Sequence, residues 1–147
     1  ENETQVMILP LINKKKFILV KQFRRPINKI TYEFPAGGCL NKKESPVNAA
    51  IRELKEETGI ILSKNKLIKI NSISINPQRQ RKLVHIFLAK ISSSDFKNKL
   101  KVKSSEIKKV EIKSFNQIVL LFKKNKIISA VVGFVFLNYL INHKKIK

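Results

Sequence analysis

Residues 38–60 read GCLNKKESPVNAAIRELKEETGI. Within this stretch Ser45 is a residue type that caps helix N-termini, and Pro46 suits the first helical position. Gly59 is the residue type preferred just past the C-terminus of a helix. The stretch therefore predicts a helix over residues 45–58 that is entered from a loop and ended by a glycine.

This predicted helix has two distinct faces. Apolar residues at spacings i, i+3, i+4 and i+7 predict one face that packs on a core; these are Val47, Ala50, Ile51 and Leu54. Glu53, Glu56 and Glu57 follow the spacing i, i+3 and i+4, so their carboxylates lie close together on another face. Half of the ten acidic residues of the chain lie between residues 33 and 57. The helix therefore concentrates negative charge in a chain that has little of it.

Like charges at these spacings repel one another and destabilise a helix. A divalent cation such as magnesium would relieve the repulsion, because it prefers oxygen ligands. Arg52 lies four residues before Glu56 and could hold that carboxylate. The alternative is a solvated helix face with no ligand, which is common for such triplets. The concentration of acids favours a metal site.

The rest of the chain alternates strand and helix patterns. Apolar runs predict strands over residues 6–12, 17–23, 29–34, 67–75, 83–91 and 107–112. Residues 115–123 and 126–142 are expected to be helical, and residues 35–38 are expected to interrupt regular structure. Strands mixed with a few helices indicate one layered α/β domain over residues 1–147.

Composition limits the classes of function. Lys and Arg number 31 against 10 Asp and Glu, a net charge of +21. Such a surface attracts polyanions, so nucleic acid is an alternative partner to a small anion. Cys39 is the only cysteine, so no intrachain disulfide forms. No signal peptide precedes the first strand and no apolar run reaches the roughly 20 residues that span a membrane, so we expect a cytoplasmic protein without membrane contact.

The motif over residues 38–60 resembles the Nudix box. Every specified position of that box is present: Gly38, Glu44, Arg52, Glu53, Leu54, Glu56, Glu57, Gly59 and Ile60. Other segments resemble the branch of ADP-ribose pyrophosphatase-like (ADP-sugar) hydrolases: Gln22-Phe23-Arg24, residues 33–38, Asn76-Pro77, residues 84–89 and residues 124–130. The resemblance covers nearly the whole chain.

The resemblance implies a Nudix-type α/β/α sandwich with a mixed β-sheet. It also implies an enzyme that hydrolyses the pyrophosphate of a nucleoside diphosphate linked to another moiety, most simply an ADP-ribose-like nucleotide sugar. Mg²⁺ or Mn²⁺ would be the cofactor. Its ligands would be Glu53, Glu56, Glu57 and the backbone carbonyl of Gly37. The released products would be a nucleoside monophosphate and a sugar phosphate.

The resemblance also suggests the other site residues. Arg52 would orient the box glutamates, and Glu106 would be the catalytic base, with Asp95 and Glu111 as weaker alternatives. Arg24 and Glu33 would contact the substrate. The loop Gln78-Arg79-Gln80-Arg81-Lys82 has no acidic residue where the branch often has one. Arg79 and Arg81 are therefore further candidates for binding phosphate.

Several expectations stay open at this point. The N-terminal β domain of the ADP-ribose branch is expected to be absent, since about five residues precede the first strand. In the branch that domain helps to bind the nucleoside and to form the homodimer, so its absence argues against ADP-ribose itself as the substrate and against that homodimer. Two alternative functions are an RNA 5′-end pyrophosphohydrolase that uses the basic surface and a non-catalytic RNA-binding module.

Overall fold

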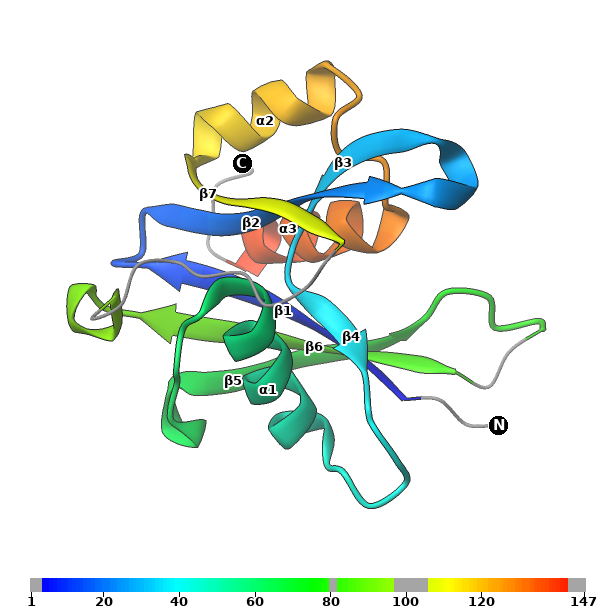
Figure 1. Cartoon of the computed structure of the whole chain (residues 1–147), viewed down its shortest axis with the longest axis vertical. Coiled ribbons are helices and arrows are strands. Elements are labelled where there is room, and N and C mark those ends of the chain that lie inside the picture. The colour runs from blue at the N-terminus through cyan, green and yellow to red at the C-terminus, as the bar shows by residue number, and fades with distance from the viewer. Residues whose placement is uncertain (1–3, 80–81, 97–105, 143–147) are drawn as a thin grey trace.

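A computed structural model of the chain describes residues 4–79, 82–96 and 106–142 (Figure 1). In these residues one mixed sheet contains β1 (Gln5–Ile12), β2 (Lys16–Arg24), β3 (Lys29–Glu33), β4 (Ala36–Gly38), β5 (Leu67–Ser74), β6 (Leu83–Ile91) and β7 (Ile107–Ser114). The α-helices are α1 (Pro46–Thr58), α2 (Phe115–Lys123) and α3 (Ala130–Asn142). Short 3-10 turns are η1 (Arg25–Ile27), η2 (Lys64–Lys66) and η3 (Ser93–Phe96).

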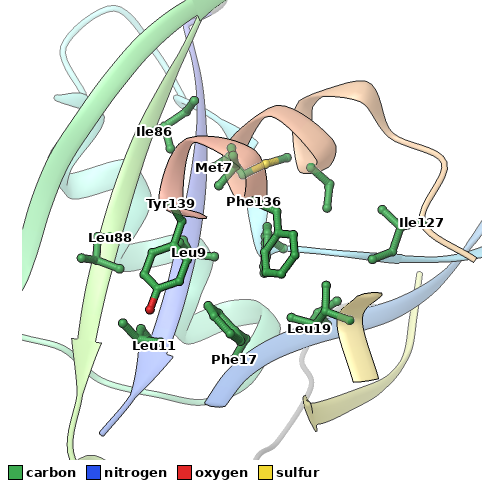
Figure 2. Packing of buried hydrophobic residues seen from close by; sticks show 14 of the residues in the cluster. Met7, Leu9, Leu11, Phe17, Leu19, Ile86, Leu88, Ile127, Phe136 and Tyr139 are labelled. Carbon is green, nitrogen blue, oxygen red and sulfur yellow. The ribbon is translucent and has the colours of Figure 1, made fainter. Parts of the chain in front are cut away.

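The sheet is covered on both faces because its central strands are apolar on both. Successive residues of a strand point to opposite faces. On β1, Met7 and Leu9 pack with residues of α2 and α3 (Figure 2). Ile8, between them, packs in a separate cluster with Ala50 and Leu54 of α1. The layers confirm the predicted α/β/α sandwich.

The sheet divides between β1 and β2. These strands pair only near their hairpin, at Leu11 with Phe17 and at Ile12 with Lys16. Farther along, β1 pairs with β4 and β2 pairs with β3. The chain crosses this opening at Pro35, whose carbonyl accepts a hydrogen bond from the Ile8 amide at 2.8 Å. The crossing carries the chain from β3, which pairs with β2, to β4, which pairs with β1.

Residues 35–38 were expected to interrupt regular structure, and for three of them this prediction is wrong. Ala36–Gly38 forms β4, which pairs antiparallel with β1 and places Gly37 opposite Val6. The amide of Cys39 extends the pairing to the Thr4 carbonyl at 2.9 Å. Tertiary pairing with a buried strand outweighs the weak strand preference of Ala-Gly-Gly.

The last helix begins four residues later than predicted. Asn125 has a left-handed backbone, with φ at 50°, and the Lys126 carbonyl accepts a hydrogen bond from the Tyr32 amide at 2.9 Å. That contact holds Lys126 against β3, so α3 starts at Ala130 after Ser129. No helix in the described ranges is long and apolar enough to cross a membrane.

Candidate active site

The ends of α1 are fixed by local contacts that the sequence predicts. The Ser45 hydroxyl accepts a hydrogen bond from the Asn48 amide at 3.2 Å, and Pro46 occupies the first turn. Gly59 adopts a left-handed φ of 78°, which L side chains rarely adopt, and its amide donates to the Lys55 carbonyl at 2.9 Å. Both predicted caps are confirmed.

Arg52 lies at the centre of the polar cluster on α1. Its Nε donates to Glu44 Oε1 at 2.9 Å, and its Nη1 donates to Glu53 Oε1 at 2.7 Å and Glu56 Oε2 at 3.3 Å. Its Nη2 donates to the Gly38 carbonyl at 2.8 Å and to Glu44 Oε2 at 3.1 Å. A guanidinium has five N–H donors. Arg52 therefore uses all of them on this cluster.

Glu44 is the main partner of Arg52, a role that the sequence alone did not suggest. It accepts two hydrogen bonds from the guanidinium and a third from the Leu40 amide at 2.7 Å. The Arg52 hydrogen bonds, with that of Leu40, lower the pKa of Glu44 despite partial burial. Eight residues and a turn separate Glu44 from Arg52, so helix periodicity could not indicate the contact. The fixed positions of the Nudix box were the available signal.

Glu53 lies directly against the backbone of β4. A Cβ atom at Gly37 would overlap the Glu53 carboxylate, so only glycine leaves room for this approach. Burial raises the pKa of Glu53, and Glu56 and Glu44 add to the increase, although Arg52 opposes it. The close approach puts a carboxylate beside the peptide groups of Gly37.

Glu57 is the most perturbed carboxylate of the cluster. Its Oε2 accepts a hydrogen bond from the Ala36 amide at 3.1 Å. Burial raises its pKa to about 8, and the negative charge of Glu53 contributes to the increase. The side chain of Glu56 is 47% exposed and contacts Arg52 instead. Glu53 and Glu57 thus face the β4 backbone, while Glu56 lies at the solvent side.

Among the described residues, no three His, Cys, Asp or Glu side chains are grouped closely enough to hold a metal ion. Glu53 and Glu57 still offer carboxylate oxygens beside the backbone of Gly37, and burial disfavours their ionised forms. Magnesium takes oxygen ligands and is usually held by one or two carboxylates together with substrate phosphates. This donor set therefore fits a hard dication.

A cavity of about 280 Å³ borders β4. Ala36 and Gly37 line it, so the strand that contacts Glu57 and Glu53 also forms a wall of the cavity. Arg24 and Glu33 line it as well, and they form a bidentate pair with Nε–Oε1 at 2.9 Å and Nη2–Oε2 at 2.7 Å. The Glu33 contacts raise the pKa of Arg24, so its guanidinium stays charged.

The other predicted site residues lie in different places. Glu106 is exposed and lines a second cavity, to which Arg24 also contributes. Arg79 is exposed in the turn that follows β5. Arg81 lies outside the described residues. The structure thus places Arg24 between Glu33 and the cavity that contains Glu106.

The two alternative bases are engaged elsewhere. Asp95 pairs with Lys66 at 2.6 Å near η2. Glu111 lies in the middle of β7 and pairs with Lys113, whose hydrogen bond lowers the pKa of Glu111. His85 lies within β6 and is hydrogen-bonded to the Ser72 hydroxyl through Nδ1 at 2.8 Å. Of the candidates for a base, Glu106 is therefore the one placed next to Arg24.

Solved structures share this fold. A crystal structure described as an ADP compounds hydrolase aligns with 99% of this chain and 77% of its own, with a TM-score of 0.74 and 21% identity. A NUDIX hydrolase from Nitrosomonas europaea aligns with 97% of this chain and 90% of its own, with a TM-score of 0.68 and 22% identity. At these identities the likeness establishes the fold.

Sequence relatives carry related names. An ADP-ribose pyrophosphatase of Bacillus subtilis (strain 168) is 43% identical over 84 residues, which is 57% of this chain and 44% of the relative. An ADP-sugar pyrophosphatase of Mus musculus is 34% identical over 98 residues, which is 63% of this chain and 43% of the relative. The chain spans less than half the length of these curated relatives. The sequence profile of the NUDIX domain matches residues 2–132, and the chain therefore belongs to the NUDIX domain family.

Proposed function

We propose that this chain hydrolyses the pyrophosphate bond of a nucleoside diphosphate linked to another moiety. An ADP-ribose-like nucleotide sugar is the leading substrate, and a nucleoside monophosphate and a sugar phosphate are the products. The observation that carries the proposal is the pair of half-buried carboxylates, Glu53 and Glu57, against the β4 backbone beside a cavity lined by Arg24. The names of the relatives support the substrate class.

The proposed cofactor is Mg²⁺ or Mn²⁺. Glu53, Glu56, Glu57 and the carbonyl of Gly37 are the residues that would hold it. When bound, such an ion neutralises phosphate charge and lowers the pKa of a bound water. Glu56 accepts the longest of the five Arg52 hydrogen bonds, at 3.3 Å, through Oε2.

The chain's own side chains would do the remaining work. Arg52 has no donor left for a ligand, so we assign it to positioning Glu53 and Glu56. Arg24 uses two of its five donors on Glu33, which leaves N–H groups for a phosphate. Pyrophosphate hydrolysis depends mainly on such positioning and on charge stabilisation.

The proton of the attacking water needs an acceptor. We assign this role to Glu106, which shares a cavity with Arg24. A carboxylate can accept the proton if it comes within hydrogen-bond reach of the water in the substrate complex. Glu33, the exposed Arg79 and, outside the described residues, Arg81 complete the proposed substrate contacts, with Glu33 acting through Arg24.

The test is phosphate release from ADP-ribose and other nucleotide sugars, dinucleotides and a capped RNA, with a coupled phosphatase and Mg²⁺. Glu57→Gln should lower turnover by about 10²-fold or more, the effect typical of losing a key carboxylate. Glu111→Gln is the matched control. It makes the same chemical change at a carboxylate that lies in the middle of β7 and pairs with Lys113. Absence of turnover on every compound, or equal loss in the two variants, would refute the proposal. Turnover restricted to RNA would assign the chain to RNA ends instead.

A further inference from the structure

A second cavity lies between the end of β2 and the start of β7. It has a volume of about 630 Å³ and is lined by Phe23, Arg24, Arg25, Pro26, Glu106 and Lys108. Arg24 lines both this cavity and the smaller one beside β4. The two spaces therefore share Arg24 as a lining residue, and a ligand held at Arg24 can extend into either.

Basic side chains dominate the wall of this second cavity. The Lys108 ammonium lies 5.4 Å from the centroid of the Phe23 ring, a cation–π contact that limits where the ammonium can move. Arg25 also lines the cavity and opens η1, next to Pro26, whose ring fixes the local backbone. Both cations are therefore attached to restrained parts of the chain.

The side chains that line the second cavity carry a net positive charge. Three cations line the cavity, and Glu106 is its one acidic lining residue among those described. Arg24 is already neutralised by Glu33. Within the described residues, no salt bridge involves Arg25 or Lys108. Two cations thus remain for a ligand against one carboxylate.

We propose that this cavity is an anion subsite, in which Arg25 and Lys108 bind a phosphate other than the two that form the hydrolysed link. The inference rests on the proposed function, since Arg24 is what connects the subsite to the glutamate cluster. It narrows the substrate class to nucleoside diphosphate-linked compounds that carry a further phosphate. Arginine and lysine both bind phosphate, and arginine can do so through two parallel hydrogen bonds.

The first test measures binding without turnover. Tripolyphosphate is titrated into the protein by calorimetry at about 0.15 M salt, which screens distant surface charge, and without divalent ions. Arg25→Ala/Lys108→Ala should weaken binding by about tenfold, the loss expected when charged hydrogen bonds are removed. The control Lys90→Ala/Lys109→Ala removes the same charge from exposed positions, and Lys109, 67% exposed, is the strand neighbour of Lys108.

The two double variants distinguish binding of tripolyphosphate at a defined site from general attraction by the positive charge of the protein surface. Binding by the control should stay within about twofold of the unchanged protein. Equal weakening in both variants, or no weakening in either, would overturn the subsite. Circular dichroism and the melting temperature establish that each variant is folded before it is titrated.

The second test separates the subsite from the proposed function. ADP-ribose is compared with two forms that carry one further phosphate, on the adenosine ribose or on the terminal ribose. The unchanged protein should hydrolyse at least one of them with a kcat/KM about tenfold higher, and Arg25→Ala/Lys108→Ala should lose this preference. Turnover with no preference refutes the subsite alone. Selective tripolyphosphate binding without any turnover refutes the proposed function and leaves the subsite standing.

Discussion

Arg52 contacts the Gly38 carbonyl of β4, Arg24 lines the cavity beside β4, and both contact glutamate, yet their surroundings differ. Arg52 is on α1, its side chain is 20% exposed, and all five of its N–H donors bind the protein. Arg24 ends β2, its side chain is 41% exposed, and within the described residues it donates to Glu33 alone.

The difference in the number of donors left over indicates that the two arginines have different functions. A guanidinium whose donors are all used fixes the carboxylates around it and has nothing left for a ligand. A guanidinium that is oriented by one buried carboxylate, and still has three donors, can bind a phosphate without losing its orientation. These contacts support the proposed roles of Arg52 as a positioning residue and of Arg24 as a ligand contact.

The largest expected effect comes from removing the saturated arginine. Arg52→Ala leaves Glu44 and Glu53 without their cation, so we expect a loss of about 2–4 kcal/mol in the free energy of unfolding, less than for a fully buried pair. The misplaced carboxylates should also lower kcat by about 10–100-fold and raise, by a similar factor, the Mg²⁺ concentration needed for half-maximal turnover. Urea unfolding and a Mg²⁺ titration of turnover measure both. Lys55→Ala, an exposed change on the same helix, is the control. A rise in KM with kcat and Mg²⁺ dependence intact would contradict the positioning role.

Removing the other arginine should give a different kinetic pattern. Arg24→Ala should raise KM by about tenfold, since a charge-assisted hydrogen bond to phosphate is lost. Glu33, 7% exposed, then lacks its partner, which should cost about 1–3 kcal/mol of stability. Adding Glu33→Gln should restore part of that stability without restoring KM. If the double variant recovers KM as well, Arg24 acts through Glu33 and does not contact the substrate.

The features that the sequence predicted correctly are those that depend on residues close together along the chain. Helix α1 was predictable because Ser45, Gly59 and the apolar spacing all lie within one segment. The contact of Glu57 with the Ala36 amide was not, since it needs β4 to pair with β1 across the divided sheet. The start of α3 was also missed, because a contact with Tyr32 holds Lys126 out of the helix.

The site shows the same division. The identities of Glu53, Glu56 and Glu57 followed from spacing, but the separation of Glu56 from the other two did not. That separation arises because Arg52 binds Glu56 on the solvent side, while Glu57 accepts a hydrogen bond from the Ala36 amide of β4. Spacing along a helix gives the face that a residue occupies and says nothing of which neighbour its carboxylate prefers.

The smallest expected effect comes from an ion pair that, among the described residues, includes neither arginine. Lys66 Nζ contacts Asp95 Oδ1 at 2.6 Å and Oδ2 at 2.8 Å, and the Ser92 amide and hydroxyl each donate to Oδ2 at 2.7 Å. Burial alone would raise the pKa of Asp95, but these hydrogen bonds outweigh it and lower the pKa to about 2. The folded state therefore favours the ionised carboxylate more than the unfolded state does.

The sign of the pH dependence follows from that shift. The stabilisation is complete above the ordinary aspartate pKa of about 3.9 and is lost as the pH falls through about 2. Asp95→Asn should therefore cost about 1–2 kcal/mol at pH 7, since Lys66 is partly exposed, and the deficit should shrink below about pH 4. Urea unfolding of both proteins at pH 7, 5, 4 and 3 measures it. Turnover should stay within about twofold, because Asp95 pairs with Lys66 and lines neither of the cavities that Arg24 lines. A deficit that persists at low pH would mean that the asparagine disrupts packing, and a large loss of turnover would identify Asp95 as the base in place of Glu106.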